Sequence, residues 1–180
     1  MNTQQIFRDK TDKIVKLWVE AVINCYPDRS RPALSSNMDP FTNPVGGMIR
    51  EAAQGLVLAI SGADIQIEQI KKSIERLIKI RAVQALSPGE AIGIIYLFKP
   101  ILRAEILPQM NKPSSFSEYL DIESRLDTLA MMAFDLYVRD REVLADIRIK
   151  EIRNQYAELK RWAQNLNSNA PLGTFTGCGN

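Results

Sequence analysis

Residues 64–90, DIQIEQIKKSIERLIKIRAVQALSPGE, decide the fold class of this chain. Their apolar side chains recur every three or four positions, which is the spacing of one face of an α-helix. The members of that face are Ile67, Ile70, Ile74, Leu77, Ile78 and Ala85. The stretch ends on Ser87-Pro88-Gly89-Glu90, a capping box with a proline inside it. It therefore predicts a helix over about 64–86, a second helix directly after it, and an all-α fold.

Helical spacing continues on the C-terminal side of this stretch. Apolar residues after Ser87 predict a helix that Pro100 kinks, because the proline ring clashes with the carbonyl of Tyr96. A second capping box begins at Ser115, and the helical pattern then runs to about Asn167 without a breaker. The apolar face of this long helix comprises Tyr119, Ile122, Leu126, Leu129, Ala133, Tyr137, Leu144 and Ile147.

Near residue 148 the apolar face of the long helix changes register. The apolar positions that follow alternate strictly by three and four residues, which is the a/d pattern of a coiled coil. We call this set the seam, and its members are Ile149, Ile152, Tyr156, Leu159, Ala163 and Leu166. The pattern predicts that the helix leaves its domain here and pairs with another helix; packing on its own domain is the alternative. We expect a helical domain at 1–147, a linker or dimerisation helix at 148–167 and a flexible tail at 168–180.

The N-terminal part of the chain predicts one helix and one long connection. The helix is expected over about 3–26, with Cys25 buried on its apolar face as a small hydrophobic residue. Residues 28–45 contain three prolines and predict an irregular loop. Long loops of this kind are more often functional than average, and we expect Phe41 to pin this one to the helical body.

The loop leads into a further helix. Asn43 followed by Pro44 reads as an N-cap with proline at the first helical position, and Gly62 ends the helix. Taken together, these segments predict a single helical domain of about five helices, either globin-like or a bundle. Its long C-terminal helix is expected to extend as a coiled-coil-like linker.

The 180 residues include no histidine, and this absence excludes several classes of function. A Ser-His-Asp triad, Cys-His catalysis, histidine-ligated zinc and a proximal haem histidine are all ruled out. We expect no cofactor and no metal. The net charge of +2 is too small to indicate a nucleic-acid partner. The longest apolar run, 91–98, is too short to span a bilayer, and no segment resembles a signal peptide, so a cytoplasmic location is expected.

Arg81 lies in the middle of the apolar face of its helix. A guanidinium in that position needs an anion or a route to water. It can hold a carboxylate ligand, or it can fix the long loop at 28–45 by binding Asp39. An internal ion pair with Asp140, Glu90 or Glu105 is the simpler alternative. Asp140 interrupts the apolar face of the long helix, where it either pairs with Arg81 or is exposed to solvent.

Cys178 lies in a tail rich in Gly, Asn and Thr. An exposed thiol on such a tail can act as a redox or persulfide-carrying arm. An incidental cysteine is the simpler interpretation, because no cation lies near it in the sequence.

Four stretches of the chain, taken in order, are distinctive as a set. They are Trp18 with Tyr26-Pro27, Asp39-Pro40-Phe41-Thr42-Asn43-Pro44-Val45-Gly46, Ile80-Arg81-Ala82-Val83-Gln84, and Ser87-Pro88 with Ala91. In this order and spacing they resemble the N-terminal domain of RsbT co-antagonist (RsbRD-type) proteins over about residues 5–145. The resemblance implies an all-helical sensory domain, with the non-haem globins of stressosome proteins as candidate relatives. Such domains tend to dimerise and to signal along a helical linker to an output domain.

The chain ends soon after its linker-like helix, so we expect the signalling or output protein to act in trans. The leading hypothesis is a bacterial, non-catalytic sensory or regulatory module that forms a homodimer through the seam. A protein or a small apolar ligand would be sensed at the loop residues Asp39, Phe41 and Asn43, with Arg81 beneath them as a ligand or structural anchor. The alternative is a redox accessory protein that uses Cys178. A carboxylate-dependent enzyme is a third hypothesis, although no pair of acidic residues is set by spacing.

Overall fold

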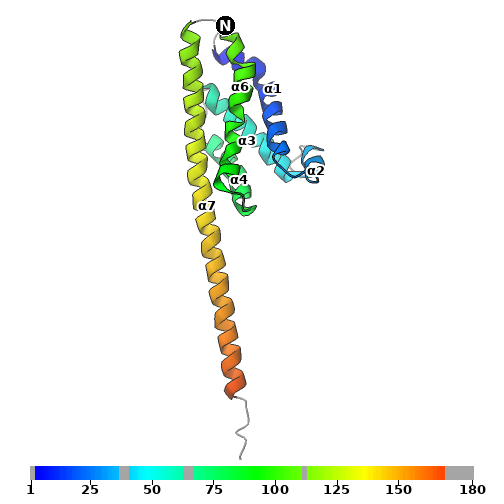
Figure 1. The fold of residues 1–180 in the computed structure, drawn as a ribbon, viewed down its shortest axis with the longest axis vertical. Helices are drawn as coiled ribbons and strands as arrows, with labels where there is room; N and C mark the ends of the chain where they lie inside the picture. Colours follow the sequence, from blue (N-terminus) through cyan, green and yellow to red (C-terminus); the bar gives the residue numbers. More distant parts are fainter. Residues whose placement is uncertain (1–2, 37–40, 63–66, 111–112, 169–180) are drawn as a thin grey trace, which may run out of the picture. The chain divides into compact units, whose positions relative to one another are not determined.

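The computed structural model describes residues 3–36, 41–62, 67–110 and 113–168, and these ranges contain helices and no strand (Figure 1). The α-helices are α1 (Thr3–Asn24), α2 (Arg31–Ser35), α3 (Pro44–Ser61), α4 (Ile67–Val83), α5 (Pro88–Tyr96), α6 (Phe98–Glu105) and α7 (Pro113–Ser168), and η1 (Leu107–Gln109) is a 3-10 helix. The prediction of an all-α chain is confirmed. The chain divides into two compact units, Met1–Arg141 and Glu142–Asn180, which we call unit 1 and unit 2.

Helix α3 forms the centre of unit 1 and packs most extensively against α4 and α1. Most of its buried residues recur every three or four positions on one face of the helix, whereas Arg50, Glu51 and Gln54 are exposed; the buried set is Gly46, Gly47, Ile49, Ala52, Ala53, Leu56, Val57 and Ile60. Gly55 allows α3 and α4 to approach closely, because a Cβ atom there would lie 2.6 Å from the hydroxyl oxygen of Ser73 in α4. Many of these side chains are small, which suits tight helix–helix packing.

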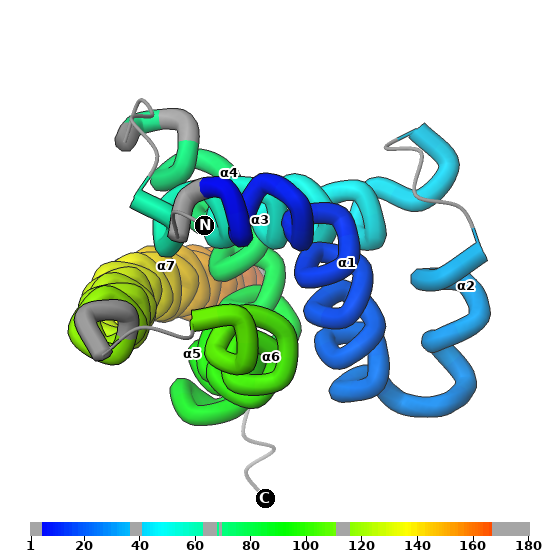
Figure 2. The backbone as a smooth tube through the Cα atoms, turned by 90° about the horizontal axis from the view of Figure 1, so that it is seen from above, coloured from blue at the N-terminus to red at the C-terminus, as the bar shows by residue number. Residues whose placement is uncertain are grey.

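Trp18 joins α1 to α5 and α6. The side chain is fully buried, its ring stacks on Phe98 with centroids 4.9 Å apart, and its indole N–H donates a 2.8 Å hydrogen bond to the carbonyl of Ile94. Helix α1 therefore contacts α6 as well as α3. Seen from above, α1 lies between α2 and α6 (Figure 2).

Local signals near α5 are confirmed in most details. Ser87 and Glu90 form the reciprocal capping box at the start of α5. Helix α4 ends at Val83 and not at residue 86, because Ala85 adopts a left-handed φ of 56° that cannot continue the helix. The predicted kink is a full break at Leu97, between α5 and α6. This break lies one turn before Pro100, where the proline ring and its missing N–H disrupt the helix.

Two boundaries differ from the predictions. The connection expected to be irregular contains α2, which has proline at its start. The Arg31 side chain of α2 donates 2.8 Å hydrogen bonds to the carbonyls of Asn24 and Tyr26, so it satisfies the end of α1. Helix α7 begins at Pro113 and not at the predicted cap Ser115, since proline is well suited to a first helical position. The extra helix and the break explain why about five helices were predicted and seven are found in the described ranges.

Glu105 in α6 joins α1 through two ion pairs and should make unit 1 sensitive to acid. Its carboxylate lies 2.6 Å from the ammonium of Lys13 and 3.0 Å from that of Lys10. These hydrogen bonds, first to Lys13 and then to Lys10, hold the pKa of Glu105 below its ordinary value of 4.5. A carboxyl group with a depressed folded-state pKa stabilises the fold above its unfolded pKa, and this stabilisation is lost as the pH falls through the folded value.

We therefore expect Glu105→Gln to lower the urea midpoint at pH 7, and the difference from the parent chain to shrink as the pH falls below 4.5. Glu20→Gln is the control, because Glu20 is exposed on α1 and no ion pair is found for it in the described part of the chain. Its effect should be small and should not follow this pH dependence. A Glu105→Gln deficit that is equal at neutral and acidic pH would contradict the role of the ion pairs.

Candidate functional site

Arg81 is the buried charge at the centre of the candidate site. It lies in the last turn of α4, and only 3% of its surface is exposed, in agreement with its predicted place on the apolar face. Burial of a guanidinium is costly unless hydrogen bonds and opposite charge replace its hydration. The neighbours of Arg81 therefore decide what the site can do.

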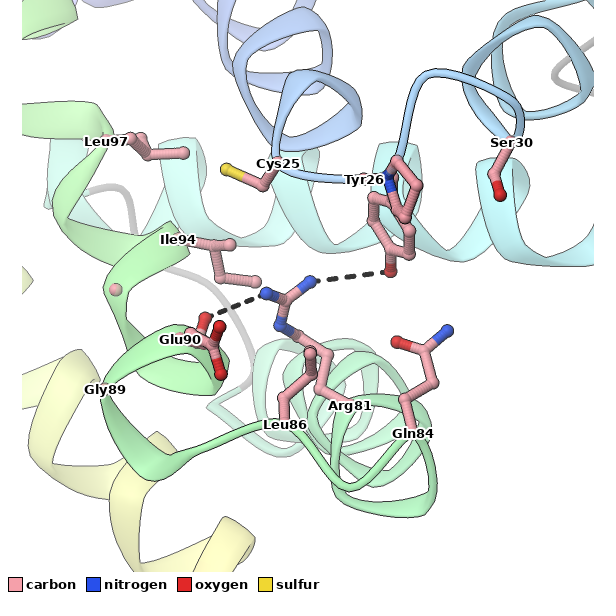
Figure 3. Close-up of a pocket in the computed structure, with 12 residues that line it drawn as sticks. Cys25, Tyr26, Ser30, Arg81, Gln84, Leu86, Gly89, Glu90, Ile94 and Leu97 are labelled. Carbon is pink, nitrogen blue, oxygen red and sulfur yellow. Dashed lines mark hydrogen bonds between the residues drawn. The ribbon is translucent and has the colours of Figure 1, made fainter.

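Two groups contact the Arg81 head group, one from the segment that follows α1 and one from α5 (Figure 3). Nη2 donates a 2.8 Å hydrogen bond to the backbone carbonyl of Glu90, in the first turn of α5. Nη1 donates a longer bond of 3.4 Å to the hydroxyl of Tyr26, whose ring centroid lies 5.7 Å from Cζ. Nε is buried and has no hydrogen-bond partner among the described residues. Of the five N–H donors of the guanidinium, two are thus engaged within the described ranges.

The predicted ion pair of Arg81 is not present, because each candidate carboxylate is engaged elsewhere. The Glu90 carboxylate accepts hydrogen bonds of 2.7 and 2.8 Å from the Ser87 hydroxyl and N–H, and these bonds, more than the charge of Arg81, lower its pKa. Glu105 pairs with the two lysines of α1. Asp140 is buried beside Arg139, 3.0 Å away, and its Oδ2 has no partner among the described residues.

A cavity of about 450 Å³ opens beside the Arg81 head group. Its lining is mostly apolar with a few polar groups: Cys25, Tyr26, Pro27, Ser30, Arg81, Gln84, Leu86, Gly89, Glu90, Gly93, Ile94 and Leu97. The prediction that Cys25 is buried is wrong, because α1 ends at Asn24 and the helical spacing no longer applies to the next residue. Ligand pockets commonly combine an apolar wall with a small number of convergent polar groups. This cavity has that composition.

The turn between α4 and α5 connects the cavity wall to α7 within unit 1. The hydroxyl of Tyr137 donates a hydrogen bond to the carbonyl of Leu86, which lines the cavity. Nη1 of Arg141 donates a 3.1 Å bond to the carbonyl of Ala82, directly after Arg81. Two hydrogen bonds thus join α7 to the end of α4 and to the turn that follows it.

Phe41 and Asn43, two of the loop residues that the sequence grouped with Arg81, do not line this cavity. Asn43 caps α3 by accepting a 2.8 Å bond from the N–H of Gly46, as predicted, and its amide donates to the carbonyls of Ala33 and Leu34. Phe41 is 95% exposed, so the prediction that it anchors the loop in the helical body is wrong. Asp39 lies outside the described residues. Tyr26 contacts Arg81 instead. The sequence analysis did not propose this residue for the site, although Tyr26-Pro27 belongs to the four stretches that carry the family resemblance.

Unit 2 exposes the complete seam. The large side chains of the seam are between 47% and 70% exposed, Ala163 is also exposed, and the neighbouring Trp162 is 64% exposed. Within unit 1, α7 has a further exposed apolar stripe at Met131, Phe134 and Val138, which the sequence analysis missed. Their spacing of three and four residues was the signal, but the stronger buried stripe on a neighbouring part of the helix surface masked it.

Other kinds of site find little support in the described ranges. No group of three or more Cys, Asp or Glu side chains in those ranges is placed to hold a metal ion, and none of their helices is long and apolar enough to cross a membrane. Cys178 lies outside the described residues.

Comparison with known proteins gives the same family as the resemblance in the sequence. The family model described as RsbT co-antagonist protein rsbRD N-terminal domain matches residues 12–152, close to the range of 5–145 over which the resemblance was noted. No significant match was found among curated proteins or solved structures. Because the match covers well over half of the sequence and includes the caps at Asn43 and Ser87 and the buried Arg81, this chain belongs to the RsbT co-antagonist rsbRD N-terminal domain family, which comprises stressosome-related signalling regulators.

Proposed function

We propose that this protein is a non-catalytic regulatory module that forms a homodimer through the seam and relays a signal from unit 1 to a partner protein. The observation that carries the proposal is the row of exposed apolar side chains at a/d spacing in unit 2. Isolated exposed apolar residues are common, but a continuous stripe of six is typical of an interaction surface. The family supports a regulatory role.

A second copy of the chain is the simplest occupant of the seam. The a/d pattern is complementary to itself, since the knobs of one helix fit the holes of an identical helix. Burial of a Leu or Ile side chain contributes about 1.5–3 kcal/mol. Partial burial of the seam on both helices therefore supplies several kcal/mol towards association.

The charges beside the seam oppose this pairing weakly. In a parallel, in-register pair, Arg148 of one helix lies opposite Arg153 of the other, and like charges repel. Exposed charge pairs are worth about 0–1 kcal/mol, so apolar burial outweighs this repulsion. Because salt screens exposed charges, we expect the dimer to tighten as ionic strength rises. An acidic heterologous partner would show the opposite salt dependence.

Size-exclusion chromatography with light scattering on the full chain tests the proposal. We expect a dimer for the parent chain and a monomer for the double variant Ile152→Gln, Leu159→Gln, because two adjacent d positions become polar. The matched control is Asn154→Gln, Ala157→Gln, which adds the same residue type on the face away from the seam and should stay dimeric. A monomeric parent chain, or a seam variant that remains dimeric, would show that the seam does not pair two copies.

The proposed relay depends on the α4–α5 turn. This turn lines the cavity through Leu86 and is hydrogen-bonded to α7 through Tyr137 and Arg141. A ligand that displaces Arg81 from the Glu90 carbonyl would shift the turn, and the two bonds would carry that shift to α7. A relay of this kind requires two stable arrangements of the contact, one with ligand and one without.

A further inference from the structure

We infer that the cavity beside Arg81 binds a small organic carboxylate, with the carboxylate on the guanidinium and a short apolar chain against the opposite wall. The inference deepens the proposed function, since it names the class of ligand that unit 1 would sense. The sequence suggested a small apolar ligand and, separately, a carboxylate held by Arg81; the geometry around Arg81 combines the two in one molecule.

The first argument is the uncompensated charge of Arg81. Only 3% of the Arg81 surface is exposed. No carboxylate in the described ranges lies within ion-pair distance of its guanidinium. The Glu90 carbonyl, the Tyr26 ring and the C-terminal end of α4 offset only part of the charge, because each offers a partial negative charge. A buried cation that lacks a full counter-charge favours an anion from solution.

The second argument is the number of free donors. Nε has no partner among the described residues, and the 3.4 Å bond from Nη1 to Tyr26 is long and therefore weak. A carboxylate accepts two parallel hydrogen bonds from a guanidinium, which is the strongest common geometry for this pair. The Tyr26 hydroxyl, released from Arg81, can then donate its own proton to the same carboxylate.

The third argument is the composition and size of the cavity. Beyond Arg81 the wall carries Ile94, Leu97 and Leu86, which suit a hydrocarbon chain. The volume of about 450 Å³ lies within the usual range for small-molecule pockets. The Glu90 carboxylate on the rim is held ionised by Ser87 and disfavours a multiply charged ion such as a phosphate dianion. A singly charged, partly apolar anion fits both features.

Thermal unfolding of the full chain with a series of straight-chain carboxylates tests the inference. The probes are acetate, butyrate, hexanoate and octanoate, each at constant ionic strength, with hexan-1-ol and hexanamide as neutral analogues of hexanoate. We expect a saturable rise in Tm that is largest for a chain of intermediate length and absent for the neutral analogues. No saturable rise with any carboxylate, or an equal rise with hexan-1-ol, would overturn the proposal.

Two variants with the same substitution on α4 locate the site. Arg81→Met should weaken hexanoate binding at least about tenfold, because a charge-assisted pair of hydrogen bonds is lost. Lys79→Met is the matched control, since Lys79 is exposed on the same helix and should leave binding unchanged. Equal loss in both variants would assign the effect to general electrostatics and not to this site.

Cys25 provides a reporter that does not require Arg81 to be replaced. It lines the cavity and is exposed, so its alkylation can be followed in a Cys178→Ser chain by intact mass. Hexanoate should slow alkylation of Cys25, whereas hexan-1-ol should not; unchanged alkylation under saturating hexanoate would place any binding elsewhere. These readouts do not depend on oligomeric state. A monomeric chain that binds hexanoate would therefore refute dimerisation through the seam and leave this inference standing.

Discussion

Replacement of Trp18 by alanine should lower the free energy of unfolding by about 3–5 kcal/mol, the range for removal of a large aromatic side chain from a core. The indole is fully buried and stacked on Phe98, so its removal leaves a cavity at the contact of α1 with α6. Its N–H also satisfies the carbonyl of Ile94, which would lose that partner. Since whole domains are stable by only about 5–15 kcal/mol, this variant should be close to unfolding at moderate temperature.

Trp162→Ala is a matched control, because the same residue type is removed from a site that is 64% exposed in unit 2. Urea titration followed by far-UV circular dichroism, at one protein concentration for all variants, compares the two losses. Trp162→Ala should change the unfolding free energy of unit 1 by less than about 0.5 kcal/mol. Equal losses in the two variants would mean that Trp18 does not hold the helices of unit 1 together.

Asn43→Ala should cost about 2–3 kcal/mol of unfolding free energy, more than loss of an ordinary helix cap. The side-chain oxygen of Asn43 caps α3, and the amide nitrogen donates to the carbonyls of Ala33 and Leu34 at the end of α2, at 3.1 and 2.7 Å. One buried side chain thus forms hydrogen bonds with backbone groups of two helices. Alanine at this position leaves those groups without their hydrogen-bond partner.

Asn43→Asp separates the two roles, because aspartate can accept from the N–H of Gly46 but cannot donate to the two carbonyls. Its urea midpoint should fall between those of the parent chain and Asn43→Ala, or below both if the carboxylate is repelled by the carbonyl oxygens. Gly46→Ala should also be destabilising, since the new Cβ would collide with the Asn43 amide and lie 2.8 Å from the carbonyl oxygen of Leu34. A parent-like midpoint for Asn43→Asp would show that the bonds to α2 contribute nothing.

The seam and the cavity divide the proposed function between the two units. Unit 2 presents apolar side chains at regular spacing, and unit 1 presents a buried charge beside an open cavity. Neither feature depends on the other for its test, because association is measured by mass and ligand binding by Tm or alkylation. Their connection through Tyr137 and Arg141 is the part of the proposal that joins them.

Sequence alone determined most of the helices and three of the caps that bound them. The Ser87 capping box, the Asn43 cap and the Gly62 terminus were all predicted, and all are present. These features depend on hydrogen bonds and side-chain spacing over a few residues, so the information lies within one or two turns of chain. The burial of Arg81 was predictable for the same reason, since its helix face is set by spacing.

Only the tertiary structure decided which groups surround that buried arginine. Tyr26 lies 55 residues away in the chain, and the Glu90 contact uses a backbone carbonyl, which the identity of the residue does not reveal. Arg81 makes none of the predicted ion pairs: the Glu90 and Asp140 carboxylates bond to nearby residues of their own helices, Ser87 and Arg139, and only Glu105 is engaged through helix packing, by the lysines of α1. Local spacing determines which side chains turn inward, but the neighbours of a buried group depend on how whole helices pack against one another, and no short stretch of sequence contains that information.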